Sequence, residues 1–288
     1  MWLANDWEDY ALLDCGDAQR LERWGDVFLV RPDPQAIWQK EGSHAAWKAP
    51  NAQYFRSEKG GGSWQLFNLD KKQWSIRYKN LTFGVKPMNF KHTGIFPEQA
   101  ANWDFSSDMI ARAGRPISLL NLFAYTGGAT LAAAAAGAEV CHVDAARGMV
   151  SWARENAVLS GLSGHPVRWI VDDCIDFISR EIRRGRRYDA IIMDPPSYGR
   201  GPTGQLWKIE DDLYRLIELT KQVLSPDPLF FIINIYSGGL APSVSGYMLG
   251  RLLCPEFGGT VRCDELGLPV EKTGLALPCG ATARWQSA

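Results

Sequence analysis

The segment YDAIIMDPPSY at residues 188–198 decides the fold class of this 288-residue chain. Residues 188–193 form a short apolar run rich in isoleucine, which is typical of a buried strand in a parallel sheet. The run ends at Asp194, and two prolines then fix the backbone and withhold their N–H donors. Ligands of open α/β sheets bind beyond the carboxyl ends of the strands. We therefore expect residues 194–198 to face a pocket, the alternative being that the prolines merely end the strand. The glycine-rich residues 199–204 predict a loop.

A second strand is expected at residues 117–123, followed by a tight turn and a small-residue helix over residues 129–136. Gly127 and Gly128 close the turn, and Gly137 is expected to end the helix. This arrangement lets a ligand approach backbone N–H groups at a helix N-terminus. The turn is neither the Gly-x-Gly-x-x-Gly dinucleotide fingerprint nor a Walker loop.

The strand expected at residues 139–144 ends in an acid, Asp144. This acid lies about twenty residues beyond the glycine turn, where folds of this kind place the carboxylate that binds a ribose. Alternatively, Asp144 caps a helix that begins near Ala146. The two roles are compatible, and the spacing favours the ribose role.

Strands and helices alternate through the rest of the chain. Further strands are expected at residues 167–171, 229–236, 259–266 and 275–285, and helices at residues 151–159, 175–182, 211–223 and 244–253. This alternation predicts an α/β fold with a doubly wound, Rossmann-like, seven-stranded and mostly parallel sheet. The preference for right-handed crossovers leaves few topologies for such a sheet.

The first eighty residues have a different character, because they are rich in turns and hold seven of the twelve tryptophans. Strands are expected at residues 26–30 and 74–78. We predict a small β-rich N-terminal domain at residues 1–80, a β-rich bridge at residues 81–100 and the doubly wound domain at residues 101–288.

Two interpretations of the tryptophan-rich region are open. Aromatic side chains next to basic residues can stack on RNA and grip its backbone, and the basic residues here are Lys71, Lys72, Arg77 and Lys79. Tryptophans of small domains more often fill the core, and we favour this role for Trp2, Trp24, Trp38 and Trp64.

Composition argues against several classes of protein. The net charge of −1 is no footprint of nucleic-acid binding, and the arginines of residues 180–187 are expected on a solvated helix end away from the pocket. The six cysteines form no Cys-x-x-Cys pair, so we expect no metal site and a cytoplasmic protein with reduced thiols. No signal peptide or membrane span is expected.

Several of these motifs resemble those of the class I S-adenosylmethionine (SAM)-dependent methyltransferases. They are NLFAYTG (121–127), HVD (142–144), WAREN (152–156), DDC (172–174) and DPPSY (194–198). The closer resemblance is to bacterial 23S ribosomal RNA methyltransferases of the RlmI/RlmK type. In that group a segment similar to KHTGIFPEQ (91–99) leads into the catalytic domain. The resemblance extends from residue 81 to residue 236.

The resemblance implies SAM as cofactor and assigns roles to individual residues. Asp144 would bind the ribose hydroxyls, Asp173 the adenine amino group and the Cys174 backbone N–H the ring edge. Gln99 would reach the carboxylate or amine of the methionine part, whereas Asn121 would be mainly structural. The remaining cofactor-binding positions are Phe123, Ala124, Tyr125, Thr126, Gly127 and Ala145.

On the acceptor side, Asp194 and the Pro195 carbonyl would orient an amino group or a base edge, with Pro196 stiffening the turn. Tyr198 would stack on a base flipped out of its helix. Cytosine C5 methylation is disfavoured, because residues 235–239 (IYSGG) hold no cysteine where the RlmI pattern has one. Cys279 is the other candidate thiol, and we expect it to be inert.

The sequence therefore predicts methyl transfer from SAM to RNA, with ribosomal RNA as the favoured acceptor. A protein side chain or a small molecule is the alternative acceptor. A nicotinamide-dependent oxidoreductase shares the sheet and the ribose acid, but the glycine fingerprint is missing. A non-catalytic cofactor-binding module is the remaining alternative, since a fold does not establish an activity.

Overall fold

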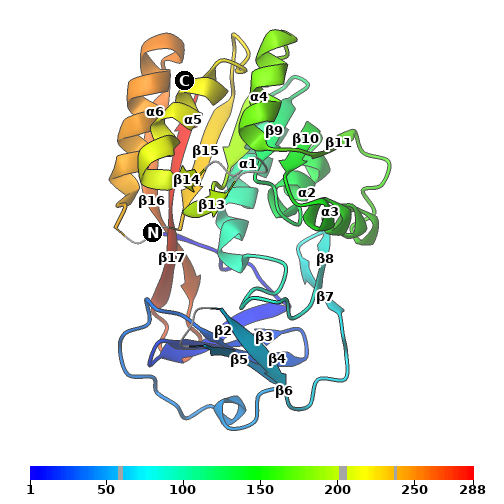
Figure 1. Ribbon diagram of the computed structural model, residues 1–288, viewed down its shortest axis with the longest axis vertical. Coiled ribbons are helices and arrows are strands. Elements are labelled where there is room, and N and C mark those ends of the chain that lie inside the picture. The colour runs from blue at the N-terminus through cyan, green and yellow to red at the C-terminus, as the bar shows by residue number, and fades with distance from the viewer. Residues whose placement is uncertain (58–60, 201–205, 237–238) are drawn as a thin grey trace. The chain divides into compact units, whose positions relative to one another are not determined.

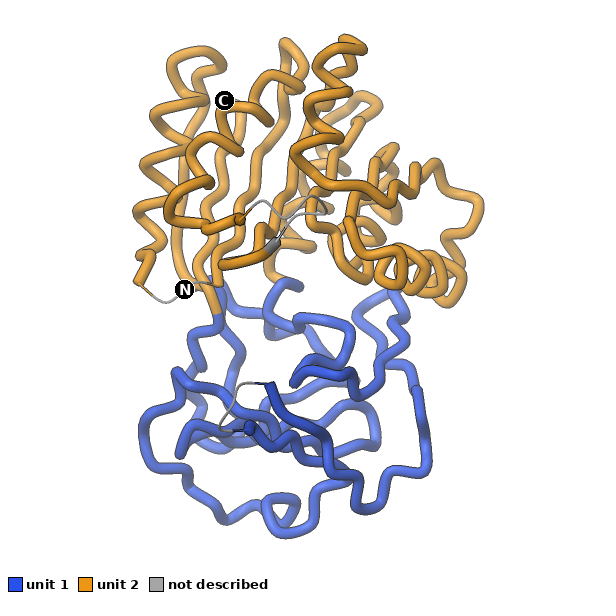
Figure 2. The backbone as a smooth tube through the Cα atoms, viewed as in Figure 1, with its two compact units in different colours: residues 1–100, 266–279 blue, residues 101–265, 280–288 orange. Residues whose placement is uncertain are grey.

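The protein divides into two compact units (Figure 2). The computed structural model describes residues 1–57, 61–200, 206–236 and 239–288. Unit 1 comprises residues 1–100 and 266–279, and unit 2 comprises residues 101–265 and 280–288. Residues 266–279, which the sequence analysis assigns to the doubly wound domain, therefore cluster with the N-terminal residues.

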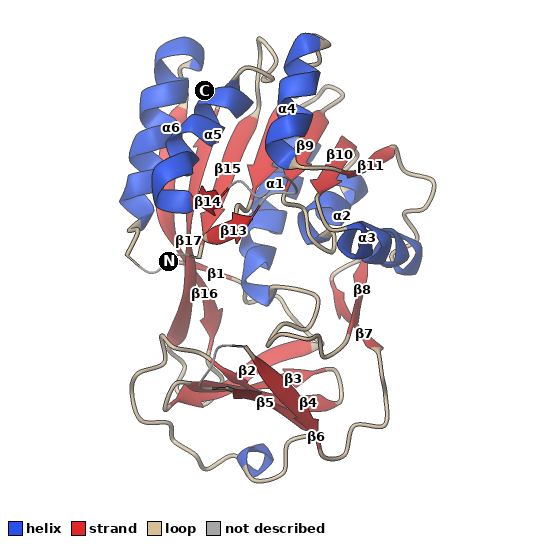
Figure 3. Ribbon diagram, viewed as in Figure 1, coloured by secondary structure: helices blue, strands red, loops and turns tan. Residues whose placement is uncertain are grey.

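Unit 2 is built on a mostly parallel sheet (Figures 1 and 3). Its strands are β9 (Ser118–Leu122), β10 (Glu139–Asp144), β11 (Val167–Val171), β12 (Ala190–Met193) and β15 (Phe230–Ile235), together with the parts of β16 (Thr260–Pro269) and β17 (Ala276–Gln286) that lie outside residues 266–279. The strands follow one another across the sheet in the order β16-β17-β15-β12-β9-β10-β11. From β15 to β11 all neighbouring strands pair in parallel, whereas β17 pairs with β15 in the antiparallel direction. Within the described residues a short eighth strand, β1 (Trp2–Leu3), pairs with Leu266 and Gly267 in the part of β16 that belongs to unit 1. The predicted doubly wound α/β fold is confirmed.

Helices cover both faces of this sheet. They are α1 (Ala100–Arg112), α2 (Gly128–Ala135), α3 (Arg147–Leu159), α4 (Cys174–Arg183), α5 (Ile209–Lys221) and α6 (Pro242–Phe257). One apolar core joins α4, α5 and α6 to the sheet face that carries Ile191. A second core joins α1 and α2 to the opposite face, which carries Ile192. The alternation of side chains along β12 thus explains why this strand is apolar at every position.

The strand order reverses between β9 and β12, because β10 follows β9 on one side and β12 lies on the other. Leu122 at the end of β9 is paired with Met193 at the end of β12. The backbone N–H of Asp194 then donates to the Leu122 carbonyl at 3.4 Å. The segments that follow these two strands therefore leave the sheet side by side, at the point where open α/β sheets bind ligands.

Unit 1 is β-rich, as predicted. Its strands are β2 (Tyr10–Gly16), β3 (Gln19–Trp24), β4 (Val27–Pro32), β5 (Ala52–Arg56), β6 (Gly62–Leu66), β7 (Trp74–Tyr78) and β8 (Leu81–Val85), with short helices η1 (Ala45–Trp47) and η2 (Pro97–Gln99). Strands β2 to β6 form one sheet in chain order, and β7 pairs with β8. The Glu271 and Lys272 N–H groups donate to the carbonyls of Leu12 and Leu13, so the C-terminal segment lies along the edge strand β2.

The helix α3 covers the residues expected to be helical at 151–159, and it begins at Arg147, close to the start expected near Ala146. One expectation about unit 2 needs correction. The loop expected at residues 199–204 is partly a hairpin, in which β13 (Tyr198–Arg200) pairs with β14 (Leu206–Lys208). Residues 201–205 lie outside the described part of the chain.

Candidate active site

The first component of the site is the glycine turn, residues 123–127, which connects β9 to α2. Phe123 and Tyr125 have φ angles of +54° and +50°. Non-glycine residues rarely adopt this left-handed conformation, which persists only where the surrounding structure holds it. Gly127, with φ +90°, is the N-cap of α2. The backbone N–H groups at this turn therefore sit at the start of a helix, where a ligand can approach them.

Neighbouring elements hold the glycine turn in this conformation. The Ala124 N–H donates to the Val143 carbonyl at 3.0 Å, which ties the turn to β10. The buried Asn156 amide of α3 donates to the Thr126 carbonyl at 2.9 Å. Ala124 and Thr126 are themselves buried. The turn is thus fixed before any ligand binds.

Asp144 at the end of β10 is the acidic partner of this turn. One carboxylate oxygen accepts from the Tyr125 N–H and the other from the Ala146 N–H, both at 2.8 Å. Burial raises the pKa of the Asp144 carboxyl, while these two bonds lower it. A carboxylate has about four acceptor positions, so two remain for a ligand with paired hydroxyls. The N-cap of α3 is Ala146, so Asp144 is not the capping residue of that helix but accepts a hydrogen bond from the residue that is. Ala145, between the two, is exposed.

Asp173 and Cys174 lie at the start of α4. Asp173 is the N-cap, and its Oδ1 accepts from the N–H groups of Ile175 and Asp176 at 2.9 and 3.2 Å. Within the described residues its second oxygen has no hydrogen bond, so it is available to a ligand's donor. Cys174 is buried, and burial raises the pKa of its thiol far above the usual value. Its sulfur accepts from the Phe123 N–H at 3.4 Å, so Cys174 is a packing residue.

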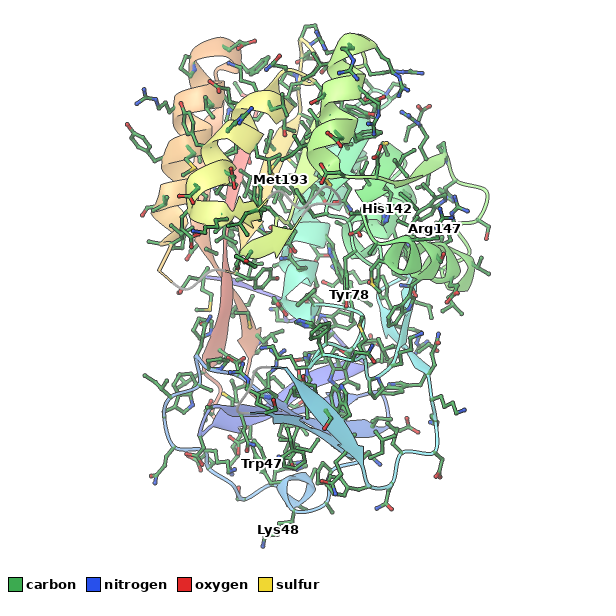
Figure 4. The ribbon with its side chains drawn as sticks, in the orientation of Figure 1. Trp47, Lys48, Tyr78, His142, Arg147 and Met193 are labelled. Carbon is green, nitrogen blue, oxygen red and sulfur yellow. The ribbon has the colours of Figure 1, made fainter. Side chains whose placement is uncertain are left out.

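The second component is the proline turn, residues 194–198, which follows β12. Met193, labelled in Figure 4, is the fully buried last residue of that strand. Beyond it Asp194 is half-buried, Pro195 is buried and Pro196 is exposed. Tyr198 is 58% exposed. The turn therefore presents a carboxylate and an accessible aromatic ring next to the glycine turn.

Trp207 in β14 is a site residue that the sequence analysis missed. Its indole N–H donates to the Pro196 carbonyl at 2.5 Å. Its ring centroid lies 6.3 Å from that of Phe123. The sequence held one signal that could have pointed to Trp207: it is an aromatic residue shortly after the glycine-rich loop that follows the proline turn.

Other residues named in the sequence analysis lie outside the two turns or outside the described part of the chain. Asn121 is buried, and its amide donates to the Thr130 hydroxyl at 2.9 Å, which supports a structural role. Gln99 ends η2 and belongs to unit 1, and its contact with the cofactor stays a prediction. Ser237 and Gly238, at the place of the missing cysteine, lie outside the described residues. Arg180, expected away from the pocket, forms an ion pair with Asp172 at the carboxyl end of β11.

Three of the four basic residues considered for RNA contact are paired with acids. Lys71 pairs with Asp26 at 2.5 Å, and Lys79 pairs with Asp6 at 3.1 Å. Arg77 pairs with Asp9 at 3.2 Å. Trp24 is fully buried, as the core-filling interpretation predicts, whereas Trp38 is 42% exposed. Contact of this unit with RNA remains a prediction.

Comparison with known proteins identifies the family. The family model described as S-adenosylmethionine-dependent methyltransferase matches residues 54–239, which is more than half of the chain. The chain belongs to this family. SAM is accordingly the cofactor of this methyltransferase, and the acceptor positions left on Asp144 and Asp173 fit the hydroxyl and amino groups of its adenosine. The oxidoreductase alternative is thereby set aside.

Solved structures and curated relatives resemble this methyltransferase to different degrees. A SAM-dependent methyltransferase from Agrobacterium tumefaciens has a TM-score of 0.93 and 36% identity, covering 99% of this chain and 92% of that one. A putative methyltransferase complexed with SAH has a TM-score of 0.72 at 19% identity, covering 98% and 76%, and shows the fold alone. The ribosomal RNA large subunit methyltransferase K of Neisseria meningitidis serogroup B is 25% identical over 76% of this chain and 63% of the relative.

The chain spans only a small part of the length of other curated relatives. It spans only 24% of the ribosomal RNA large subunit methyltransferase K/L of Syntrophotalea carbinolica, at 29% identity over 62% of this chain.

In the part of the chain that the structure describes, no helix has the length and apolar character needed to cross a membrane. Nor do three or more His, Cys, Asp or Glu side chains gather there as metal ligands.

Proposed function

We propose that this methyltransferase transfers the methyl group of SAM to a base of ribosomal RNA. The names of the curated relatives support this acceptor, and the two adjacent turns support the geometry of transfer. An acceptor of this kind implies a cytoplasmic enzyme.

On the cofactor side, the carboxylate of Asp144 would accept from the ribose hydroxyls, and Asp173 would accept from the adenine amino group. Residues 123–127 would hold the methionine part. When bound, SAM supplies an electrophilic methyl group on a cationic sulfur. The protein's contribution is therefore positioning and electrostatic alignment, because no proton has to be added to the leaving group.

On the acceptor side, Asp194 and the Pro195 carbonyl offer two hydrogen-bond acceptors. Two acceptors suit a base edge that carries an amino group, which has two N–H donors. The exposed ring of Tyr198 suits stacking on a flipped base. A covalent route through Cys279 is not proposed, since burial and the neighbouring Glu98 raise the pKa of that thiol well above its usual value.

The observation that carries this proposal is the pairing of Leu122 with Met193 at the ends of β9 and β12. This pairing makes the glycine turn and the proline turn neighbours. Methyl transfer requires the reacting atoms to approach to about 3–3.5 Å in line, so a cofactor turn and an acceptor turn must be adjacent.

The test is transfer of labelled methyl groups from SAM to ribosomal RNA isolated from cells that lack this gene. Labelled RNA, and loss of label with Asp194→Ala, are expected. RNA from cells that contain the gene is the control, since its site is already occupied. Absence of label in RNA of the deletion strain, with a protein that binds SAM, would refute the RNA acceptor.

A protein or small-molecule acceptor is the second candidate. The net charge of −1 favours it, as do the ion pairs that occupy Lys71, Arg77 and Lys79 in unit 1. Incubation of labelled SAM with the protein and metabolite fractions of the same deletion strain separates this candidate from the first.

A further inference from the structure

Trp207 contacts both turns of the active site. Its indole N–H donates to the Pro196 carbonyl of the proline turn at 2.5 Å. Its ring lies against Phe123 of the glycine turn, with centroids 6.3 Å apart and ring planes inclined by 40°. Trp207 is thus a side chain that touches a residue from each of the two segments that must meet for transfer.

The hairpin places Trp207 in this position. Trp207 is paired with Gly199 across the two strands, and Tyr198 is paired with Lys208. Side chains of paired residues lie on the same face of a hairpin, so the missing side chain of Gly199 leaves that face to the indole. The Ile209 N–H donates to the Ser197 carbonyl at 3.1 Å and anchors the returning strand.

We propose that Trp207 is a positioning residue that locks the proline turn against the glycine turn. The indole N–H occupies the Pro196 carbonyl and fixes the peptide plane that joins Pro196 to Ser197. This restrains the preceding residues, so that the Pro195 carbonyl and the Asp194 carboxylate each keep a single orientation toward the acceptor. The contact with Phe123 makes this geometry depend on the conformation of the cofactor turn.

This inference rests on the proposed use of the proline turn for the acceptor, and two conservative variants test it. Trp207→Phe keeps a ring against Phe123 but removes the N–H donor. At saturating SAM, its kcat for methyl transfer should fall about three- to tenfold, the factor carried by one neutral hydrogen bond. Its Kd for SAM should stay within about twofold, since the ring contact remains.

The matched control is Trp38→Phe. Trp38 also donates its indole N–H to a backbone carbonyl, that of Cys15 at 3.0 Å, but it lies in unit 1. This variant should leave both kcat and the Kd for SAM unchanged. An unchanged kcat in folded Trp207→Phe, or an equal loss in Trp38→Phe, would overturn the proposal.

A double-mutant cycle on SAM binding tests the contact with Phe123 without any acceptor. Phe123→Ala and Trp207→Ala should each raise the Kd for SAM, and the double variant should be no weaker than the weaker single variant. Fold-changes that multiply would show that the two residues act independently and would refute the coupling. If wild-type enzyme methylates no RNA, the proposed function fails, whereas this cycle still decides the role of Trp207.

Discussion

One carboxylate oxygen of Asp144 accepts a hydrogen bond from the backbone N–H of Tyr125 at 2.8 Å. This bond joins the end of β10 to a residue whose φ of +50° is unfavourable for a tyrosine. Asp144 therefore holds the strained turn in place, and in the proposed function the same acid also binds the ribose of SAM.

We predict that Asp144→Ala raises the Kd for SAM at least about tenfold. Charged hydrogen bonds are worth about 1.5–3 kcal/mol, and the turn loses its support as well. Isothermal titration calorimetry measures this change. Glu139→Ala, an exposed acid at the start of the same strand, is the control and should bind normally. Normal binding by a folded Asp144→Ala protein would remove Asp144 from the ribose site.

A second prediction concerns the pH dependence of stability. His142 (Figure 4) is fully buried on β10, where its Nδ1 lies 2.9 Å from the Thr130 hydroxyl. Burial lowers the pKa of His142 from 6.5 to about 3. The unfolded chain then takes up a proton below pH 6.5 that the folded protein refuses until about pH 3. The contribution of His142 to stability is thus fully present above pH 6.5 and falls by up to about 1.4 kcal/mol per pH unit below it.

Urea denaturation at pH 7 and pH 5 tests this prediction. His142→Gln should lose about 2 kcal/mol less than wild type between these two pH values, whatever its stability at pH 7. His165→Gln removes an exposed histidine and should show the wild-type slope. A wild-type slope in His142→Gln would show that His142 does not carry the effect.

A third prediction concerns the thiols. RNA that contains 5-fluorocytosine should form no covalent adduct with the enzyme, because the raised pKa of Cys279 keeps its sulfur protonated. Denaturing gel electrophoresis after incubation with SAM detects such adducts. An adduct that disappears in Cys279→Ala would restore cytosine C5 chemistry.

A fourth prediction concerns the proline turn. Asp194→Ala should abolish methyl transfer, and Tyr198→Ala should lower kcat/KM roughly ten- to a hundredfold, since stacking on a base is worth about 1–3 kcal/mol. Tyr198→Phe should keep most activity, because the ring face is retained. The Kd for SAM should change little in both Tyr198 variants.

Melting temperatures provide the control for these variants. Because Tyr198 is 58% exposed, it should contribute little to folding. A joint fall of melting temperature and SAM affinity in Tyr198→Ala would mean that the ring only packs the loop. Full transfer by a stable Tyr198→Ala protein would end the stacking proposal.

Much of unit 2 is predictable from the sequence because its central strands are buried on both faces. Residues 190–193 are apolar throughout, since α5 and α1 pack on opposite sides of β12. The turns after β9 and β12 follow from their glycines and prolines. The positive φ angles of Phe123 and Tyr125 were not predictable, because tertiary hydrogen bonds impose them on residues that disfavour them.

The missed features depend on contacts that leave no local signal. Strands β13 and β14 have only three residues each, too few for a visible alternation. The turn between β2 and β3 is built from Asp17 and Ala18, both with positive φ, instead of the usual Asn-Gly. Trp207 joins the candidate site only because the hairpin of β13 and β14 brings it back to Pro196.

The C-terminal segment that lies along β2 has a consequence for how the chain is made. A polypeptide leaves the ribosome from its N-terminus, so β2 emerges long before residues 270–272, whose backbone covers its edge. An uncovered strand edge is a template for pairing with other chains. Throughout the synthesis of residues 101–265, the nascent chain therefore carries this exposed edge. The N-terminal unit finishes folding only after residues 270–272 have been made, and a chain that lacks them keeps an aggregation-prone strand.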